Sequence, residues 1–253
     1  MNSPFSLSGR TILVTGASSG IGRCIALQAS RAGARLVLTG RSGERLKETE
    51  GQLEGTGHLS IKLDLGDTAK IEPCITNVLK EAGPLSGFVH SAGVSAMTLL
   101  RDASPEHMED MMRVNWLSFM ELSRVVCRRG RYAPGLSVVA VASISASTPQ
   151  PGLSVYGATK GALISAARSL AAEYASRGIR FNCVSPANVD TPMQQEARRV
   201  GGEEWYQREV LDRAKLGLLS PEDIANPVVF LLSDAARRIT AANMIIDGGY
   251  SFS

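Results

Sequence analysis

The chain opens with a strand, a glycine-rich turn, a helix and a second strand, and this pattern constrains the fold most. The β-branched run Thr11–Thr15 leads into GASSGIG, and the helical spacing that follows ends at Gly33. A second β-branched run covers Arg35–Thr39. Successive strands joined by a helix are parallel, because the crossover returns the chain to the same end of the sheet. Residues 11–39 therefore predict a βαβ unit.

Strands and helices continue to alternate along the chain. Further strands are expected at Leu59–Leu63, Leu85–His90, Leu136–Ala142, Ile179–Val184 and Met244–Ile246. Helices are expected at Glu44–Leu53, Thr68–Ala82, Pro105–Arg128, from Tyr156 to Gly178, and at Pro221–Leu232 after an N-cap at Ser220. The central strands are apolar without alternation, which is typical of a parallel sheet with helices on both faces. The pattern predicts an α/β fold with a doubly wound parallel sheet, in a single domain over residues 1–253.

Polar residues and glycines gather directly after the expected strands. In an open parallel sheet, ligands bind outside the carboxyl ends of the strands. We therefore expect one crevice to be formed by Gly16–Gly22, Arg41, Asp64, Ser91–Gly93, Ser143 and Ser185–Met193.

The first turn has the composition of a nucleotide-binding turn. Gly16, Gly20 and Gly22 open a helix, where glycines let the backbone approach a pyrophosphate and the helix start offers free N–H groups. Ser18 and Ser19 add hydroxyl donors. The alternative is a tight turn packed on the sheet.

Ser143, Tyr156 and Lys160 form a candidate catalytic group. Tyr156 and Lys160 are four residues apart on an expected helix, so they share a face. An ammonium at ~4 Å from the phenol, in an effective dielectric of ~20, favours the phenolate by about 4 kcal/mol. We therefore expect the tyrosine pKa to fall from ~10 to near neutrality, where a proton donor or acceptor works best. The alternative is an incidental pair at the start of a surface helix.

The end of the second strand predicts the choice of nucleotide. An acid there usually bonds the ribose hydroxyls of NAD, but Leu38–Arg41 contains no Asp or Glu. Gly40 leaves room for a 2′-phosphate, and Arg41 offers a forked, permanent cation suited to it. We expect NADP(H) to be preferred over NAD(H), unless Arg41 is a solvated loop charge.

The motifs together resemble the short-chain dehydrogenase/reductase family. The resemblance covers essentially the whole chain and rests on TGASSGIG at 15–22, Ser-Ala-Gly at 91–93, Asn115, Ser143, YGATK at 156–160, SPANVDTPM at 185–193 and the C-terminal DGG. It implies a Rossmann-like fold and a nicotinamide cofactor. It also implies Tyr156 as acid/base, Lys160 as the group that lowers its pKa and contacts the nicotinamide ribose, Ser143 as a substrate-orienting hydroxyl, and Asn115 as the holder of a water.

The resemblance also gives a set of cofactor-binding residues. These are Gly16, Ser18, Ser19, Gly20, Ile21, Gly22, Arg41, Asp64, Leu65, Ser91, Ala92, Gly93, Tyr156, Lys160, Pro186, Val189 and Thr191. Asp64 would accept from the adenine amino group, its alternative being a turn or cap aspartate, and Val189 and Thr191 would lie near the nicotinamide carboxamide. Ser19 stands where many NADP-preferring relatives carry a basic residue.

Two positions depart from the family pattern. Ser91 replaces the usual asparagine, and its shorter side chain puts one support of the sheet in doubt. Ala187 replaces the usual glycine after Pro186, which would be unfavourable if the position needs a positive φ.

Within the family, the length and the ASRGIRFNCVSP stretch look most like bacterial 3-oxoacyl-[acyl-carrier-protein] reductases. Sugar, alcohol and steroid dehydrogenases share the same framework, and a non-catalytic nucleotide-binding module or a scaffold would have the same fold. The arginines at 128, 129, 131 and 177 resemble a docking site for acyl carrier protein, or are solvated charges at helix ends. The family and the small residues Ala162, Ala166, Ala167 and Ala171 suggest a homotetramer.

The segment at about 191–219, which we call the lid segment, is expected to cover the substrate. It contains Met193, Trp205 and Tyr206, interrupted by Gly201-Gly202, and its alternative is an ordinary amphipathic helix on the core. Gln150, Pro151 and Leu153 are expected on the opposite wall. These residues fit an acyl chain or a ring, and the resemblance implies that the substrate is a small carbonyl or alcohol compound.

Composition excludes several other classes of protein. A net charge of +3 gives no electrostatic case for nucleic acid. The four cysteines are scattered and form no metal-like spacing, so we expect no metal site. We also expect them to be free thiols in a reducing cytoplasm. The N-terminus shows no signal-peptide pattern, and no apolar run approaches the ~20 residues of a membrane span.

Overall fold

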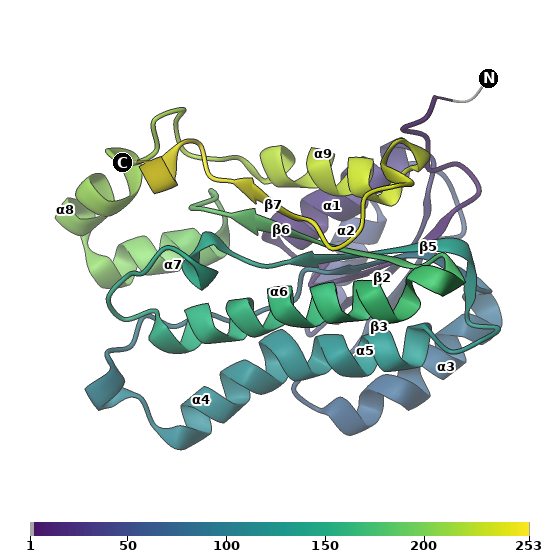
Figure 1. Cartoon of the computed structure of the whole chain (residues 1–253), viewed down its shortest axis with the longest axis horizontal. Coiled ribbons are helices and arrows are strands. Elements are labelled where there is room, and N and C mark those ends of the chain that lie inside the picture. Colours follow the sequence, from purple (N-terminus) through teal and green to yellow (C-terminus); the bar gives the residue numbers. More distant parts are fainter. Residues whose placement is uncertain (1–2, 253) are drawn as a thin grey trace.

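Seven parallel strands form one sheet at the centre of the computed structural model, which describes residues 3–252 (Figure 1). The strands are β1 (Thr11–Thr15), β2 (Arg35–Gly40), β3 (Leu59–Lys62), β4 (Leu85–His90), β5 (Tyr132–Val141), β6 (Arg180–Pro186) and β7 (Asn243–Ile246). Their order is β3-β2-β1-β4-β5-β6-β7, so the chain reverses its direction of travel between β1 and β4. Ligands bind at such a reversal in open α/β sheets.

The register aligns the carboxyl ends of the central strands. Thr15 pairs with Thr39 on one side and with His90 on the other. His90 in turn pairs with Ala140 of β5. The residues that follow these strands therefore start from one edge of the sheet, as the sequence pattern predicts.

Helices cover both faces of the sheet and build two cores. On one face lie α1 (Gly20–Arg31), α2 (Gly43–Glu50) and α9 (Pro221–Leu232), and on the other α3 (Ile71–Ala82), α4 (Pro105–Met112), α5 (Ser118–Val126) and α6 (Ser154–Tyr174) (Figure 1). Ile12, Ile25 and Ile224 belong to the first core, and Phe88 and Phe119 to the second. The predicted doubly wound fold and its single domain are confirmed.

The expected helix at 105–128 is divided in two. A π-helical turn, Arg113–Leu117, separates α4 from α5, and the buried Asn115 lies within it. The expected helix at 68–82 likewise begins as a 3-10 turn, Thr68–Lys70, before α3. Single π turns inside a helix are frequent at functional sites.

The start of α9 follows the sequence prediction. Ser220 Oγ accepts from Asp223 N at 3.3 Å, and the Asp223 carboxylate accepts from Ser220 N at 2.8 Å. This capping box satisfies two of the free N–H groups at the helix start, and Pro221 occupies the first helical position.

The lid segment folds into α7 (Pro192–Gly201), the short α8 (Glu203–Tyr206) and a π turn, Gln207–Leu211. Gly202, with φ +82°, separates α7 from α8. Across the described part of the chain, the search for a helix long and apolar enough to cross a membrane finds none. Residues 3–252 likewise contain no group of three metal-ligating side chains.

Candidate functional site

A cavity of about 640 Å³ lies at the carboxyl ends of the strands. Every sequence-predicted site residue except Asn115 lines it: Gly16, Ser18, Ser19, Gly20, Ile21, Gly22, Arg41, Asp64, Leu65, Ser91, Ala92, Gly93, Ser143, Tyr156, Lys160, Pro186, Val189 and Thr191. The predicted convergence of these segments on one crevice therefore agrees with the geometry.

The glycine turn after β1 is packed too closely for side chains. Gly16 has φ +68°, and a Cβ there would lie 2.9 Å from the Cα of Ala92. A Cβ on Gly22 would run into the carbonyl oxygen of Gly16. The turn after β1 therefore packs directly against the loop that follows β4 and against the start of α1. All three segments border the same cavity.

Three features of this end of the cavity fit a dinucleotide. Within residues 3–252, the N-cap Ser19 makes no capping hydrogen bond through its side chain, so the first N–H groups of α1 remain available to an anion. The buried Oγ1 of Thr39 also has no partner among the described residues. Arg41 is exposed and lines the cavity beside it. Asp64 lines the cavity as well, and its Oδ1 accepts from Gly66 N at 2.9 Å, so it is also a turn aspartate.

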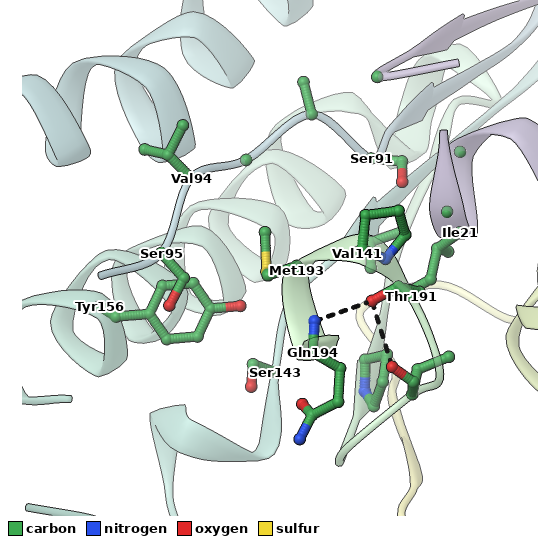
Figure 2. Close-up of a pocket in the computed structure, with 18 of the residues that line it drawn as sticks. Ile21, Ser91, Val94, Ser95, Val141, Ser143, Tyr156, Thr191, Met193 and Gln194 are labelled. Carbon is green, nitrogen blue, oxygen red and sulfur yellow. Dashed lines mark hydrogen bonds between the residues drawn. The ribbon is translucent and has the colours of Figure 1, made fainter. Parts of the chain in front are cut away.

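Ser143 and Tyr156 meet at the other end of the cavity. Ser143 Oγ accepts from Ser145 N at 3.1 Å and donates to Ser145 Oγ at 3.2 Å, which orients the hydroxyl in the part of the cavity that the phenol of Tyr156 also lines. Figure 2 shows both side chains bordering the space next to Met193 and Gln194 of α7. Burial raises the pKa of Tyr156 to about 12, and the nearby hydroxyl of Ser143 offsets this rise only in part.

Lys160 lies beside the tyrosine ring, with Nζ 5.6 Å from the ring centroid. Its Nζ donates to the carbonyl oxygen of Val141 at 2.8 Å, and burial lowers the pKa of Lys160 to about 8. The expected fall of the Tyr156 pKa toward neutrality is therefore wrong for this structure. The ammonium is directed at the backbone carbonyl of Val141, and burial is the largest cause of the shift in the pKa of the phenol.

Asn115 lies behind the cavity and clamps two segments together. Its Oδ1 accepts from Val94 N at 2.8 Å, and its Nδ2 donates to Val94 O at 2.9 Å and to Thr159 Oγ1 at 3.0 Å. A Cβ on Gly93 would lie 3.3 Å from Asn115 Oδ1 and 3.4 Å from Lys160 Nζ. Both ends of the amide are occupied by the protein itself, so the predicted water would have to bind another atom.

Sequence reasoning missed a buried network that ends on Asn115. Thr15 Oγ1 accepts from Ser91 N and Ala92 N, both at 3.1 Å, which leaves its proton for His90 Nδ1 at 3.3 Å. His90 Nε2 then donates to the carbonyl oxygen of Asn115 at 3.3 Å. Burial lowers the pKa of His90 to about 3, so the ring is neutral, as this network requires. His90 ends an expected strand, and no motif marks it.

The walls of the substrate half agree with the sequence prediction in part. Gln150, Leu153, Met193 and Trp205 line the cavity. Among the described residues, Pro151 and Tyr206 are not part of the lining, and Tyr206 is buried beneath the guanidinium of Arg198. Asn188, Gln194 and Val200 line the cavity from the predicted segments 185–193 and 191–219, whereas Ser95, Met97 and Ser145 are among the lining residues that lie outside every predicted segment.

The two departures from the family pattern differ in what the structure shows. Within residues 3–252 the hydroxyl of Ser91 makes no hydrogen bond, and the residue is held through its backbone N–H, which donates to Thr15 Oγ1. Among the described non-glycine residues Ala241 has a positive φ, 61°, and Ala187 does not, so alanine is unstrained at 187.

The expected basic docking site is partly neutralised within the chain. Arg128 forms an ion pair with Glu72, and Arg131 Nη2 lies 3.9 Å from the same carboxylate. Arg177 lies over the ring of Tyr174. Arg129 is exposed.

Comparison with known proteins identifies the family. The model of a family described as enoyl-(acyl carrier protein) reductase matches residues 16–251. A 2,3-dihydro-2,3-dihydroxybenzoate dehydrogenase of Escherichia coli is 34% identical, over 96% of this chain and 97% of that protein. A 3-oxoacyl-[acyl-carrier-protein] reductase of Salmonella typhimurium is 32% identical, over 96% and 98%.

A solved structure agrees with these relatives. A Beutenbergia cavernae protein, described as an NAD(P)-dependent gluconate 5-dehydrogenase with NADP bound at low occupancy, superposes with a TM-score of 0.88. It is 30% identical, over 99% of this chain and 100% of that one. The chain therefore belongs to the short-chain dehydrogenase/reductase family and is an oxidoreductase.

Proposed function

We propose that the protein interconverts a ketone and a secondary alcohol in a small molecule, with NADP(H) as the cofactor. The observation that carries this proposal is the meeting of Ser143 and Tyr156 in the same cavity as the uncapped start of α1. One end of the cavity suits an anionic nucleotide, and the other holds two hydroxyls around a space for a carbonyl.

In the proposal, each part of the cavity holds one part of the dinucleotide. The turn Gly16–Gly22 receives the pyrophosphate, Asp64 and Leu65 border the adenine, and Thr39 and Arg41 border its ribose. Lys160 contacts the nicotinamide ribose, with Pro186, Val189 and Thr191 nearby. The bound nicotinamide supplies or accepts the hydride.

Ser143 and Tyr156 handle the substrate oxygen. The Ser143 hydroxyl holds the carbonyl oxygen, and the phenol of Tyr156 donates a proton to it during reduction. The raised pKa of Tyr156 keeps the phenol neutral at pH 7, which is the form that can donate. Asn115 and His90 keep the neighbouring loop and α6 in place.

Two substrate classes fit the lining, and the relatives suggest both. Met97, Met193, Val200 and Trp205 give an apolar wall that suits an acyl chain or a ring. A 3-oxoacyl thioester delivered by acyl carrier protein is one candidate, with exposed Arg129 and Arg177 as contacts for the carrier. A diol or polyol is the alternative, supported by the polar Ser95, Gln150 and Asn188. The internal pairing of Arg128 and Arg131 with Glu72 reduces the case for the carrier.

The same proposal includes a homotetramer in the cytoplasm. Leu117, beside Asn115, is 41% exposed, and Ile245 on the edge strand β7 is 54% exposed, which suits faces covered by other copies. Four free cysteines suit a reducing compartment. Light scattering at micromolar concentration tests the assembly, and a monomer mass would refute it.

The first prediction tests the acid/base role with a substrate panel. The panel contains an acetoacetyl thioester, a cyclic dihydrodiol, 2-hydroxycyclohexanone and gluconate, each assayed with the matching redox form of the cofactor. Tyr156→Phe keeps the ring and removes the proton donor, so we expect kcat on the best substrate to fall by about 10²–10⁴. Cofactor affinity, measured by fluorescence titration, should change little.

Tyr132→Phe, at the start of β5, is the matched control and should keep wild-type turnover. Near-wild-type turnover in Tyr156→Phe would remove this residue from its role, and no turnover of any panel member by the wild type would count against the proposed substrates.

The second prediction concerns the nucleotide. A charge-assisted contact of roughly 1.5–3 kcal/mol corresponds to about a ten- to hundred-fold preference for NADPH over NADH in kcat/KM. Arg41→Ala should largely abolish this preference, whereas Arg45→Ala, an exposed arginine in α2, should keep it. A wild-type preference for NADH, or an unchanged ratio in Arg41→Ala, would overturn the assignment.

The third prediction follows from the buried charge of Lys160. Its pKa is near 10.5 in the unfolded chain and about 8 in the folded one, so between these values the unfolded state binds more protons. Stability therefore rises with pH in that window, by about 2 kcal/mol from this group between pH 7 and pH 9.5. Lys160→Met removes this rise.

Urea unfolding of the wild type, Lys160→Met and the exposed control Lys80→Met at both pH values measures the effect. The gain in stability on going to pH 9.5 should be about 2 kcal/mol smaller in Lys160→Met than in the other two proteins. Equal pH dependence in all three proteins would mean that Lys160 is not held with a depressed pKa.

A further inference from the structure

The side chain of Tyr250 is fully buried, near the C-terminal end of the described chain, and belongs to none of the motifs discussed above. Its hydroxyl is hydrogen-bonded by Gln150 Nε2 and, at 3.2 Å, by Arg213 Nη1. Burying a hydroxyl is unfavourable unless it is hydrogen-bonded, so the loss of these bonds would destabilise this arrangement.

Arg213 connects Tyr250 to the lid segment. Its guanidinium lies 4.2 Å from the centroid of the Tyr250 ring, and its Nη1 lies 3.7 Å from Glu209 in the π turn. The backbone makes a second tie, because Leu216 N donates to Gly248 O at 2.9 Å. The 3-10 turn Tyr250–Phe252, drawn in yellow, accordingly lies near α8 in Figure 1. Residues 212–219, the last part of the lid segment, are thus held to Tyr250 by Arg213 and to Gly248 by the backbone bond of Leu216.

Gln150 connects Tyr250 to the cavity, which it lines from the loop that precedes α6. The buried hydroxyl of Tyr250 therefore joins this part of the cavity wall to Arg213, at the end of the lid segment. The three residues are far apart in the sequence, so a motif search does not group them.

We propose that Tyr250 is a positioning residue, which fixes Gln150 in the substrate half of the cavity and holds the lid segment to it through Arg213. The inference rests on the proposed function, because it concerns the substrate half of the same cavity. The nucleotide end is built from other segments, so Tyr250 sets the affinity for the substrate and not the affinity for the cofactor.

The experiment compares Tyr250→Phe with Tyr174→Phe in the full chain. Each substitution keeps a ring that has an arginine over it, Arg213 or Arg177, and removes only the hydroxyl. With the panel compound that the wild type turns over best, we expect Tyr250→Phe to raise KM about 5- to 20-fold, the effect of losing one or two hydrogen bonds. Its kcat should stay within about two-fold, and the Kd for NADPH should be unchanged.

Gln150→Leu should give the same rise in KM, and the double variant Tyr250→Phe/Gln150→Leu should be no worse than Gln150→Leu alone. Additive effects would mean that Tyr250 does not act through Gln150. An unchanged KM in Tyr250→Phe, or a parallel change in Kd for NADPH, would overturn the proposal.

Hydrogen exchange separates this proposal from the proposed function, because it needs no substrate. Amides of residues 212–219 should exchange faster in Tyr250→Phe than in the wild type or in Tyr174→Phe, with α6 unchanged. If the wild type turns over no panel compound, the proposed function fails, and the exchange rates still decide whether Tyr250 fastens the lid segment. Equal exchange in all three proteins would refute that tie.

Discussion

The amide of Asn115 is the interaction on which the rest of the site depends. It binds both backbone groups of Val94 and the hydroxyl of Thr159, so it joins the loop after β4 to α6. This loop carries Ala92, against which Gly16 packs, and α6 carries Tyr156 and Lys160. One buried amide therefore relates the nucleotide end of the cavity to the catalytic end. Removing it would leave several buried polar groups unpaired at once, which is more damaging than the loss of a single hydrogen bond.

Burial shifts the pKa values of the two titratable groups near Asn115 in opposite directions, upward for Tyr156 and downward for Lys160. It disfavours the phenolate of Tyr156 and the ammonium of Lys160, because both are charged forms in a poorly solvated place. At pH 7 the outcome is a neutral phenol and a charged lysine held by the carbonyl of Val141. This combination suits donation of a proton to a carbonyl oxygen. The buried ammonium lowers the stability of the folded protein, and such a loss of stability is typical of active sites.

Much of the fold follows from the sequence because its signals are local. The runs at 11–15 and 85–90 are strands as expected, and Pro221 with Ser220 starts a helix. The convergence of distant turns on one cavity follows from a single rule, that parallel strands end on the same edge. The interruption at Asn115, in contrast, depends on contacts with residues at 94 and 159, which no local pattern contains.

The rest of the site could not be predicted for the same physical reason. The orientation of His90, the carbonyl partner of Lys160 and the bonds to Tyr250 all join residues that only the finished fold brings together. The spacing of Tyr156 and Lys160 correctly indicated a shared neighbourhood. It did not indicate burial, which determines the direction of both pKa shifts.

The central claim is that this cavity passes a hydride directly between a nicotinamide and a carbon atom of the substrate. The most direct measurement uses NADPH carrying deuterium on one face of C4, with the wild-type enzyme and the ketone that it reduces best, and analyses the alcohol by mass spectrometry and NMR. The account predicts one deuterium at the carbinol carbon from one of the two labelled faces and none from the other. An alcohol without cofactor deuterium, whichever face is labelled, would contradict it.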